Sequence, residues 1–204
     1  IHGLEEAPDG SLVLVMPLVS GRDLQTELEE RGPLAGPAAA ALVQRVGEAV
    51  AHSHERGVLH RDIKPENVLL PEPGRPVLTD FGLSKDKVED IKENSLQTFC
   101  GTVEYMAPEL VKGQKYSVAV DWWSYGVLVY EMMCTRTPFF HQKGRKAIFQ
   151  GIIKNDPQFP MHFSGASQDF ISKLLAKEVR QSVRQSVSQS VSQSVSQLAS
   201  SIKL

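Results

Sequence analysis

The chain has little cysteine, no large excess of charge and no long apolar run. Its 204 residues include two cysteines, Cys100 and Cys134, too few for the disulfide framework of a small secreted domain. We therefore expect reduced thiols and an intracellular location, cytoplasmic, nuclear or both. The formal net charge of -2 gives no overall field favouring nucleic acid or an anionic membrane. We therefore expect no nucleic-acid partner. The longest apolar stretch, within residues 11–20, has strand length, so we also expect no membrane span.

The sequence also has no signal peptide and no initiating methionine. It opens with Ile-His-Gly and soon reaches Glu5 and Glu6, which does not fit an apolar leader. We expect that the start is missing or that this is an internal piece. The composition, 41% hydrophobic and 23% charged, is ordinary for a globular domain, and the length suits one domain with a sizeable core.

Apolar periodicity predicts the elements of residues 1–178. Leu42, Val46 and Val50 recur at four-residue spacing, which predicts a helix over 38–56 closed by Gly57. The β-rich run from Leu12 to Val19 predicts a strand. Further elements are expected as helices at Asp23–Glu30, Ala119–Met133, Lys143–Lys154 and Ser167–Ala176, and as a strand at Val77–Thr79.

Residues 179–204 differ in character from the rest. A valine recurs every fourth residue from Val179 to Val195, within copies close to Ser-Val-Ser-Gln. In a helix, this spacing would place the valines along one face. However, Val and Ser are weak helix formers and little apolar surface is available to bury, so we predict a disordered low-complexity tail. A four-base DNA repeat, TCAG, would also encode this tetrapeptide.

The strongest chemical signal is the run His-Arg-Asp-Ile-Lys-Pro-Glu-Asn at residues 60–67, followed by Asp80-Phe81-Gly82. Phosphoryl transfer needs a carboxylate to take the proton of an attacking hydroxyl, cations beside the phosphate and oxygen ligands for Mg²⁺. Asp62, Lys64, Asn67 and Asp80 supply these groups in that order. His-Arg-Asp alone would fit a solvated turn equally well.

Two more motifs follow in order, Gly-Thr-Val-Glu-Tyr-Met-Ala-Pro-Glu at 101–109 and Asp-Trp-Trp-Ser-Tyr-Gly at 121–126. With the first two they make the chain resemble the eukaryotic protein kinases over roughly residues 1–178. The resemblance implies a partial kinase domain at 1–178, an α+β fold like the kinase C-terminal lobe. That lobe would be mainly helical with short strands at the cleft, and the N-terminal lobe would be largely absent.

The resemblance assigns roles at the cleft and implies ATP and Mg²⁺ as cofactors. Asp62 would be the catalytic base, Lys64 would contact the γ-phosphate, and Asn67 and Asp80 would bind Mg²⁺. The strand ending at Val19 would lead into the hinge; it also fits a simple buried strand. The adenine pocket would then be lined by Met16 at its back, the Pro17 carbonyl, the Val19 backbone, Leu69 as its floor and Thr79 at its border.

The catalytic run and Thr102 are typical of serine/threonine kinases. Residues 98–102, Thr-Phe-Cys-Gly-Thr, resemble the AGC group, in which the position of Thr98 is phosphorylated by an upstream kinase. Arg61 and Lys85 are candidates to pair with that phosphate. An ordinary loop threonine is the alternative.

Acidic residues are expected to select the substrate. Glu66, Glu104 and Glu131 match positions that bind basic residues upstream of the target hydroxyl, with Asp23 joining them and Thr102 near the target itself. The protein substrate would then carry Arg or Lys before its Ser or Thr. Alternatively, these acids serve solvation and local pairing.

Two departures from the family pattern bear on activity. The glycine-rich loop, phosphate-binding lysine and helix glutamate of a full domain are not found, so we expect little transfer activity from the isolated chain. The arginine expected opposite Glu109 falls on Ser182, between Arg180 and Arg184. An active kinase represented in part is favoured because every C-lobe catalytic residue is retained. The alternatives are a pseudokinase-like binding module and a non-functional product of a damaged gene.

Overall fold

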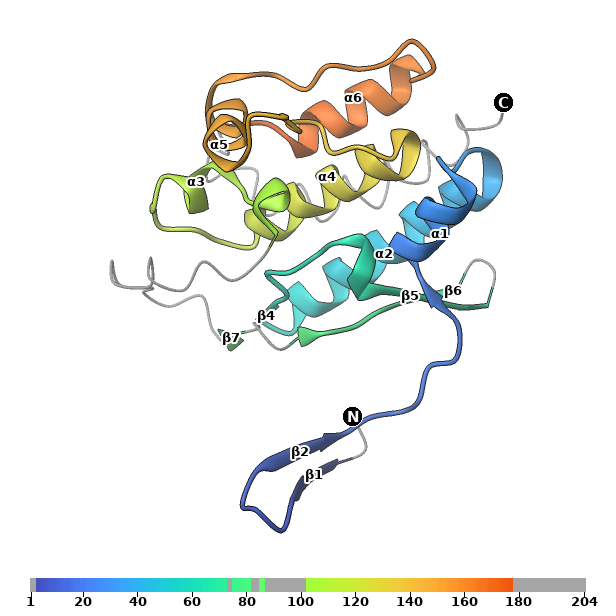
Figure 1. Ribbon diagram of the computed structural model, residues 1–204, viewed down its shortest axis with the longest axis vertical. Coiled ribbons are helices and arrows are strands. Elements are labelled where there is room, and N and C mark those ends of the chain that lie inside the picture. The colour runs from blue at the N-terminus through green and yellow to red at the C-terminus, as the bar shows by residue number, and fades with distance from the viewer. Residues whose placement is uncertain (1–2, 73–74, 82–84, 87–101, 178–204) are drawn as a thin grey trace.

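The computed structural model describes residues 3–72, 75–81, 85–86 and 102–177, which form six α-helices and seven short strands (Figure 1). Predictions for Thr98, Cys100 and the tail lie outside these residues. The strands are β1 (Gly3–Glu6), β2 (Leu12–Val15), β3 (Arg22–Asp23), β4 (Val58–Leu59), β5 (Val68–Glu72), β6 (Arg75–Leu78) and β7 (Lys85–Asp86). The helices are α1 (Leu24–Arg31), α2 (Gly36–Glu55), α3 (Pro108–Val111), α4 (Ala119–Cys134), α5 (Arg145–Lys154) and α6 (Gly165–Leu174).

Helix α4 is the centre of the core and lies between α2 and α6 (Figure 1). It is apolar around its whole circumference, as a helix with neighbours on every side must be. On α2, Leu42, Val46 and Val50 are all buried, so the four-residue spacing correctly predicted this helix. Gly57 follows α2 with a φ of 75°, as expected of a residue that ends a helix in the left-handed conformation.

Close contacts around α4 depend on two glycines, which have no Cβ. Tyr125 is fully buried and donates a hydrogen bond from its hydroxyl to the Val43 carbonyl at 2.7 Å. The hydroxyl fits because a Cβ at Gly47 would lie 2.9 Å from it. On the opposite side, a Cβ at Gly126 would lie 2.8 Å from the Cβ of Leu174 on α6. The three helices can therefore approach closely enough to exclude water.

Strands β1 and β2 form an antiparallel hairpin that extends away from the helices (Figure 1). The predicted strand from Leu12 to Val19 is wrong in its second half, because β2 ends at Val15. Pro17 has no N–H to donate to a ladder, and Leu18 is 96% exposed. Residues 16–21 instead form the irregular connection to β3.

Strands β3, β5 and β6 form a second sheet in that order. Asp23 pairs with Leu69, and Leu69 pairs with Val77 on the other side. Gly21 begins this pairing with a φ of 136°, and a Cβ there would lie 2.5 Å from the Leu70 carbonyl oxygen. Because β5 starts at Val68, the sheet fixes the residues that come directly before it.

The other predicted elements are confirmed with shifted ends. The helices expected at 23–30, 119–133, 143–154 and 167–176 are α1, α4, α5 and α6, each displaced by two residues or fewer at either end. The strand expected at 77–79 is β6, which starts at Arg75 and ends at Leu78. No helix in the described part of the chain has the length and apolar character needed to cross a membrane.

Candidate active site

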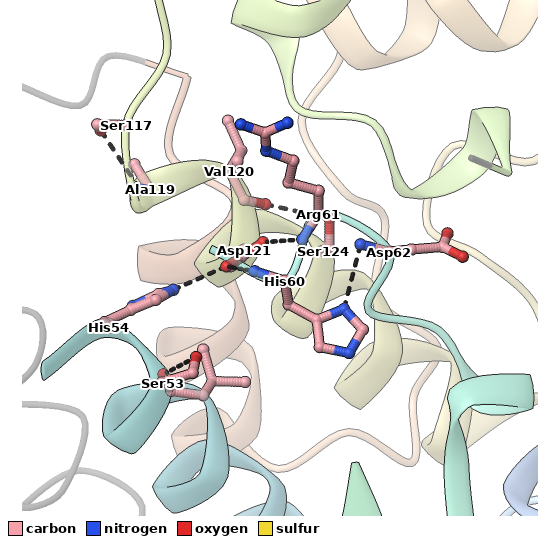
Figure 2. A network of polar contacts seen from close by, with 11 residues as sticks. Ser53, His54, His60, Arg61, Asp62, Ser117, Ala119, Val120, Asp121 and Ser124 are labelled. Atoms are coloured by element: carbon pink, nitrogen blue, oxygen red, sulfur yellow. Dashed lines mark hydrogen bonds and ion pairs between the residues drawn. The ribbon is translucent and has the colours of Figure 1, made fainter. Parts of the chain in front are cut away.

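A buried carboxylate fixes the backbone at the start of the polar run 60–67. Asp121, in the first turn of α4, has no exposed surface. Its Oδ2 accepts hydrogen bonds from the His60 N–H at 2.9 Å and from His54 Nε2 at 2.8 Å, and its Oδ1 accepts from the Arg61 N–H at 2.8 Å (Figure 2). Arg61 has a φ of 69°, a strained value that these bonds hold in place.

His60 connects this backbone to the strand on the other side of the site. Its Nδ1 accepts from the Asp62 N–H at 3.3 Å, so Nε2 carries the proton and donates to the Thr79 carbonyl at 2.9 Å. Burial lowers the pKa of His60, which keeps the imidazole neutral. The ring also lies 4.4 Å from the ring of Phe81. One uncharged side chain therefore ties Asp62 to the segment that carries Asp80.

Asp62, Lys64 and Asn67, three of the residues singled out in the sequence, form one cluster of direct contacts. The Lys64 ammonium lies 2.8 Å from Asp62 Oδ2. Asn67 Nδ2 donates to the same oxygen at 3.0 Å and to the Asp62 carbonyl at 2.7 Å. Burial alone would lower the pKa of Lys64, but its hydrogen bond to Asp62 and the surrounding carboxylates raise it. Lys64 therefore carries a full positive charge beside a carboxylate.

Asn67 and Asp80 supply the oxygen donors that Mg²⁺ prefers. The Asn67 backbone carbonyl accepts a hydrogen bond from the Thr79 N–H at 2.9 Å. Asp80 is the next residue after Thr79, so this bond holds Asp80 close to Asn67. Because Nδ2 of Asn67 is used by Asp62, its Oδ1 is the side-chain atom suited to a cation. The described residues contain no group of three or more His, Cys, Asp or Glu side chains able to hold a metal by themselves. The pair fits a site that takes its remaining ligands from phosphate and water.

The residues predicted to contact adenine are divided between two places. Leu69 and Thr79 are half-buried, on β5 and directly after β6, next to the catalytic cluster. Met16 and Pro17 are exposed on the irregular connection, where Met16 is 54% exposed, and Val19 is half-buried. The pairing of β3 with β5 places the end of this connection, at Gly21, beside Leu70 and Pro71.

Three acidic side chains predicted to bind substrate interact with one another. Glu131, near the end of α4, is largely buried, and burial together with the charges of Glu66 and Glu104 raises its pKa to about 7. The Tyr105 hydroxyl donates a hydrogen bond to Glu131 Oε2. Thr102 directly precedes the short turn Val103–Tyr105 that carries Glu104. This cluster concentrates negative charge on the face where Glu66 leaves the catalytic run.

Asp23 has a structural role of its own. Its Oδ1 accepts from the Thr26 N–H at 2.8 Å and its Oδ2 accepts from the Thr26 hydroxyl at 3.1 Å, so it caps the N-terminus of α1. Strand β3, which carries Asp23, contacts the turn Pro65–Asn67 that carries Glu66.

Comparison with known proteins gives the family. A family model described as the protein kinase domain matches residues 4–195. The chain belongs to the protein kinase family. The match runs past residue 178, where the sequence analysis placed the end of the domain.

Several curated relatives are similar over most of the chain. It is 41% identical over 167 residues to the Arabidopsis thaliana serine/threonine-protein kinase AtPK1/AtPK6, covering 82% of this chain and 35% of that protein. It is 38% identical over 170 residues to the Caenorhabditis elegans ribosomal protein S6 kinase beta, covering 83% of this chain and 30% of that protein. The chain therefore spans about a third of the length of these kinases.

The acidic cluster of this kinase chain gives a pH-dependent stability. Glu131 has an ordinary pKa of 4.5 when unfolded and about 7 when folded. The folded state therefore holds a proton that the unfolded state loses, and this stabilisation is lost as pH rises from about 4.5 through 7. Because Glu131 keeps some contact with water, we expect a loss of about 1–2 kcal/mol between pH 5 and pH 8.

Urea unfolding of the parent and of Glu131→Gln at both pH values measures this effect. The variant should match the parent at pH 5 and exceed its stability by the stated amount at pH 8. The control Glu30→Gln, at an exposed position on α1, should show the stability of the parent at both pH values. Equal pH dependence in parent and Glu131→Gln would contradict the assignment.

Glu109 in the Ala-Pro-Glu motif of the kinase family has a raised pKa because it is buried. The position of the arginine expected opposite it, Ser182, and the neighbouring Arg180 and Arg184 lie outside the described residues. Neither Asp121 nor His54 was assigned a role from the sequence. For Asp121, an aspartate in the first turn of a largely apolar helix was a usable signal. His54 had no such signal, since its partner is 67 residues away.

Proposed function

We propose that this chain provides the hinge and the C-terminal lobe of a serine/threonine protein kinase, which transfers the γ-phosphate of ATP to protein substrates. The observation that carries the proposal is the cluster of Asp62, Lys64 and Asn67, joined by direct contacts and positioned by Asp121. The AtPK1/AtPK6 and S6 kinase names of the relatives support the same activity.

The charges of the cluster match the needs of this reaction. The Asp62 carboxylate lies beside the Lys64 ammonium. It can accept the proton of a serine or threonine hydroxyl as that oxygen bonds to phosphorus and the bond from phosphorus to the β-phosphate oxygen of ATP breaks, which releases ADP. The Lys64 ammonium, 2.8 Å away, can neutralise an oxygen of the transferred group. Since this chemistry depends on position and charge, a rigid cluster of this kind is what it requires.

Nucleotide and metal would bind next to the cluster. Asn67 and Asp80 would hold Mg²⁺, which neutralises phosphate charge when it is bound. Adenine would lie between the connection carrying Met16, Pro17 and Val19 and the sheet residues Leu69 and Thr79. The exposed Met16 side chain would then be covered by the base.

The acidic cluster supports a preference for basic residues in the substrate. Burial, and after it repulsion from Glu66 and Glu104, raises the pKa of Glu131. A lysine or arginine side chain would offset that repulsion. Thr102 would lie beside the target hydroxyl, and Asp23, which caps α1, would contribute at most its charge.

Thr98 would be phosphorylated by an upstream kinase, and Arg61 and Lys85 are the candidates to pair with the phosphate. The low cysteine content agrees with a cytoplasmic or nuclear protein.

A pseudokinase-like binding module is the second candidate. It is favoured by one feature, the exposed connection at residues 16–18, which would be available to a partner. It predicts ligand binding without phosphate transfer.

Calorimetry with Mg²⁺-ATP tests the proposal on the full chain. We expect Mg²⁺-dependent binding that is weakened at least about tenfold by Asp80→Asn, because the substitution removes the charged metal ligand. Asp169→Asn, at an exposed position on α6 where the aspartate pairs with Lys173, is the matched control and should bind within twofold of the parent. A folded parent without binding, or equal loss in both variants, would contradict the proposal.

A further inference from the structure

The charges of this chain are unevenly distributed. The 24 residues from 132 to 155 contain five Lys or Arg and no Asp or Glu. The remaining residues contain 17 basic and 24 acidic side chains, a net charge of -7. One segment, from the end of α4 through α5, is therefore basic in a protein that is otherwise acidic. Its basic residues are Arg136, Lys143, Arg145, Lys146 and Lys154.

The loop before α5 brings three of these cations together. The Gly144 N–H donates to the His141 carbonyl at 3.1 Å, and the Lys143 N–H donates to His141 Nδ1 at 3.1 Å. These bonds close a tight turn directly before Arg145, and residues 140–146 are all exposed. Lys143, Arg145 and Lys146 are therefore held within a few residues on one short exposed segment.

The charges of these three cations are not neutralised by ion pairs within the described fold. No ion pair to Lys143, Arg145 or Lys146 is present among the described residues. Arg145 and Lys146 also occupy the first turn of α5, where positive side chains oppose the helix dipole. The cations repel one another as well, so a negatively charged partner would stabilise them.

An aromatic side chain lies next to the cations and faces outward. Phe139 is buried and stacks on Trp123 with ring centroids 5.7 Å apart, which fixes the backbone at this point. The following residue, Phe140, is 51% exposed, and the Arg136 guanidinium lies 5.8 Å from its ring centroid. A large exposed ring beside a cation is a typical anchor at protein interfaces.

We propose that Arg136, Phe140, Lys143, Arg145 and Lys146 form a docking surface for a short acidic segment of a partner protein, with an apolar residue that packs on Phe140. We call these five residues the α5 basic surface. Helix α5 contacts the turn Val103–Tyr105, so a partner bound here lies beside the segment of Thr102 and Glu104. Docking does not require phosphate transfer and is independent of the proposed activity.

A short peptide suits the surface better than a membrane or a nucleic acid. Helix α5 has ten residues and is about 15 Å long, and Asp156, 93% exposed at the side chain, follows at its other end. An extended anionic surface would meet this carboxylate and the acidic remainder of the chain. A segment of a few residues would contact the cations alone.

The test measures binding of a fluorescein-labelled twelve-residue peptide, made of Asp and Glu around one Phe, to the full chain by fluorescence anisotropy at about 0.15 M salt. The variant Lys143→Gln/Arg145→Gln/Lys146→Gln should bind about tenfold more weakly, since three exposed charge contacts are lost. The matched control, Arg31→Gln/Arg45→Gln/Lys173→Gln, removes three exposed cations and should bind within twofold of the parent.

Further variants make the outcome decisive. Phe140→Ala should weaken binding of the Phe-containing peptide. It should not change binding of a peptide that has Gly in place of Phe. If the triple variant does not fold, Lys143→Gln alone, outside the helix, should still weaken binding measurably. Equal losses in both triple variants, no binding by a folded parent, or binding to phosphatidylserine vesicles without binding to the peptide would each overturn the proposal.

Discussion

Replacing Asp121 with alanine should lower the free energy of unfolding by about 3–5 kcal/mol, a large part of the ~5–15 kcal/mol typical of a domain. Asp121 is fully buried and accepts from the backbone N–H groups of His60 and Arg61 and from His54. Without the carboxylate, these donors stay buried and unpaired, and each unpaired donor carries its full desolvation cost. The strained backbone at Arg61 also loses its support.

Urea unfolding followed by circular dichroism measures this change. Asp121→Asn keeps one acceptor oxygen, so it should fall between the parent and the alanine variant. Asp169→Ala, which removes an exposed carboxylate from α6, should change stability by less than about 0.5 kcal/mol. If Asp121→Ala were as stable as the parent, another group would have to satisfy these N–H donors, and the account of the anchor would be wrong.

Replacing Asp62 with alanine should reduce phosphate transfer about 10³-fold while changing stability little. The large kinetic effect follows from the loss of the only carboxylate that directly contacts both Lys64 and Asn67 among the described residues, and general-base groups contribute about 10²–10⁴-fold. The small structural effect follows because Asn67 keeps its 2.7 Å bond to the backbone carbonyl of residue 62.

The measurement is single-turnover transfer from ATP to a peptide with arginine before its serine, with parent and variant in identical preparations. The ratio of the two rates then does not depend on how fast the parent reacts. Asp169→Ala is again the control and should transfer at the parent rate. If the parent transfers phosphate and the rate of Asp62→Ala is within tenfold of the parent rate, the base assignment is wrong. If Asp62→Ala also loses its folded structure, the loss of rate reflects a folding defect instead.

Local patterns predicted the helices well because each signal lies within one segment. The spacing of Leu42, Val46 and Val50 is a property of α2 alone, and the continuous apolar character of residues 119–133 already required a helix with neighbours on all sides. The end of β2 was predicted less well. A β-rich composition continues to Val19, yet Pro17 ends the ladder at a point that only pairing with β1 defines.

The candidate site divides in the same way. Asp62, Lys64 and Asn67 are neighbours in the sequence, so their cluster followed from a motif. The contacts of Asp121 with His60 and Arg61 join residues 61 and 60 positions apart, and no local pattern encodes them. The raised pKa of Glu131 depends first on its burial and then on the charges of Glu66 and Glu104, which lie on two other elements.

Helix α4 also sets the distance between the polar run 60–67 and the acidic cluster. Asp121 in its first turn holds the catalytic run, and Glu131 near its end belongs to the acidic cluster. Ten residues of α-helix set these two points about 15 Å apart along the axis, and inserting a single residue would rotate one against the other by about 100°. In the proposed substrate, the distance between the target hydroxyl and a basic side chain would then be determined by the length of this buried helix. Surface substitutions could change the affinity for the substrate without changing that distance.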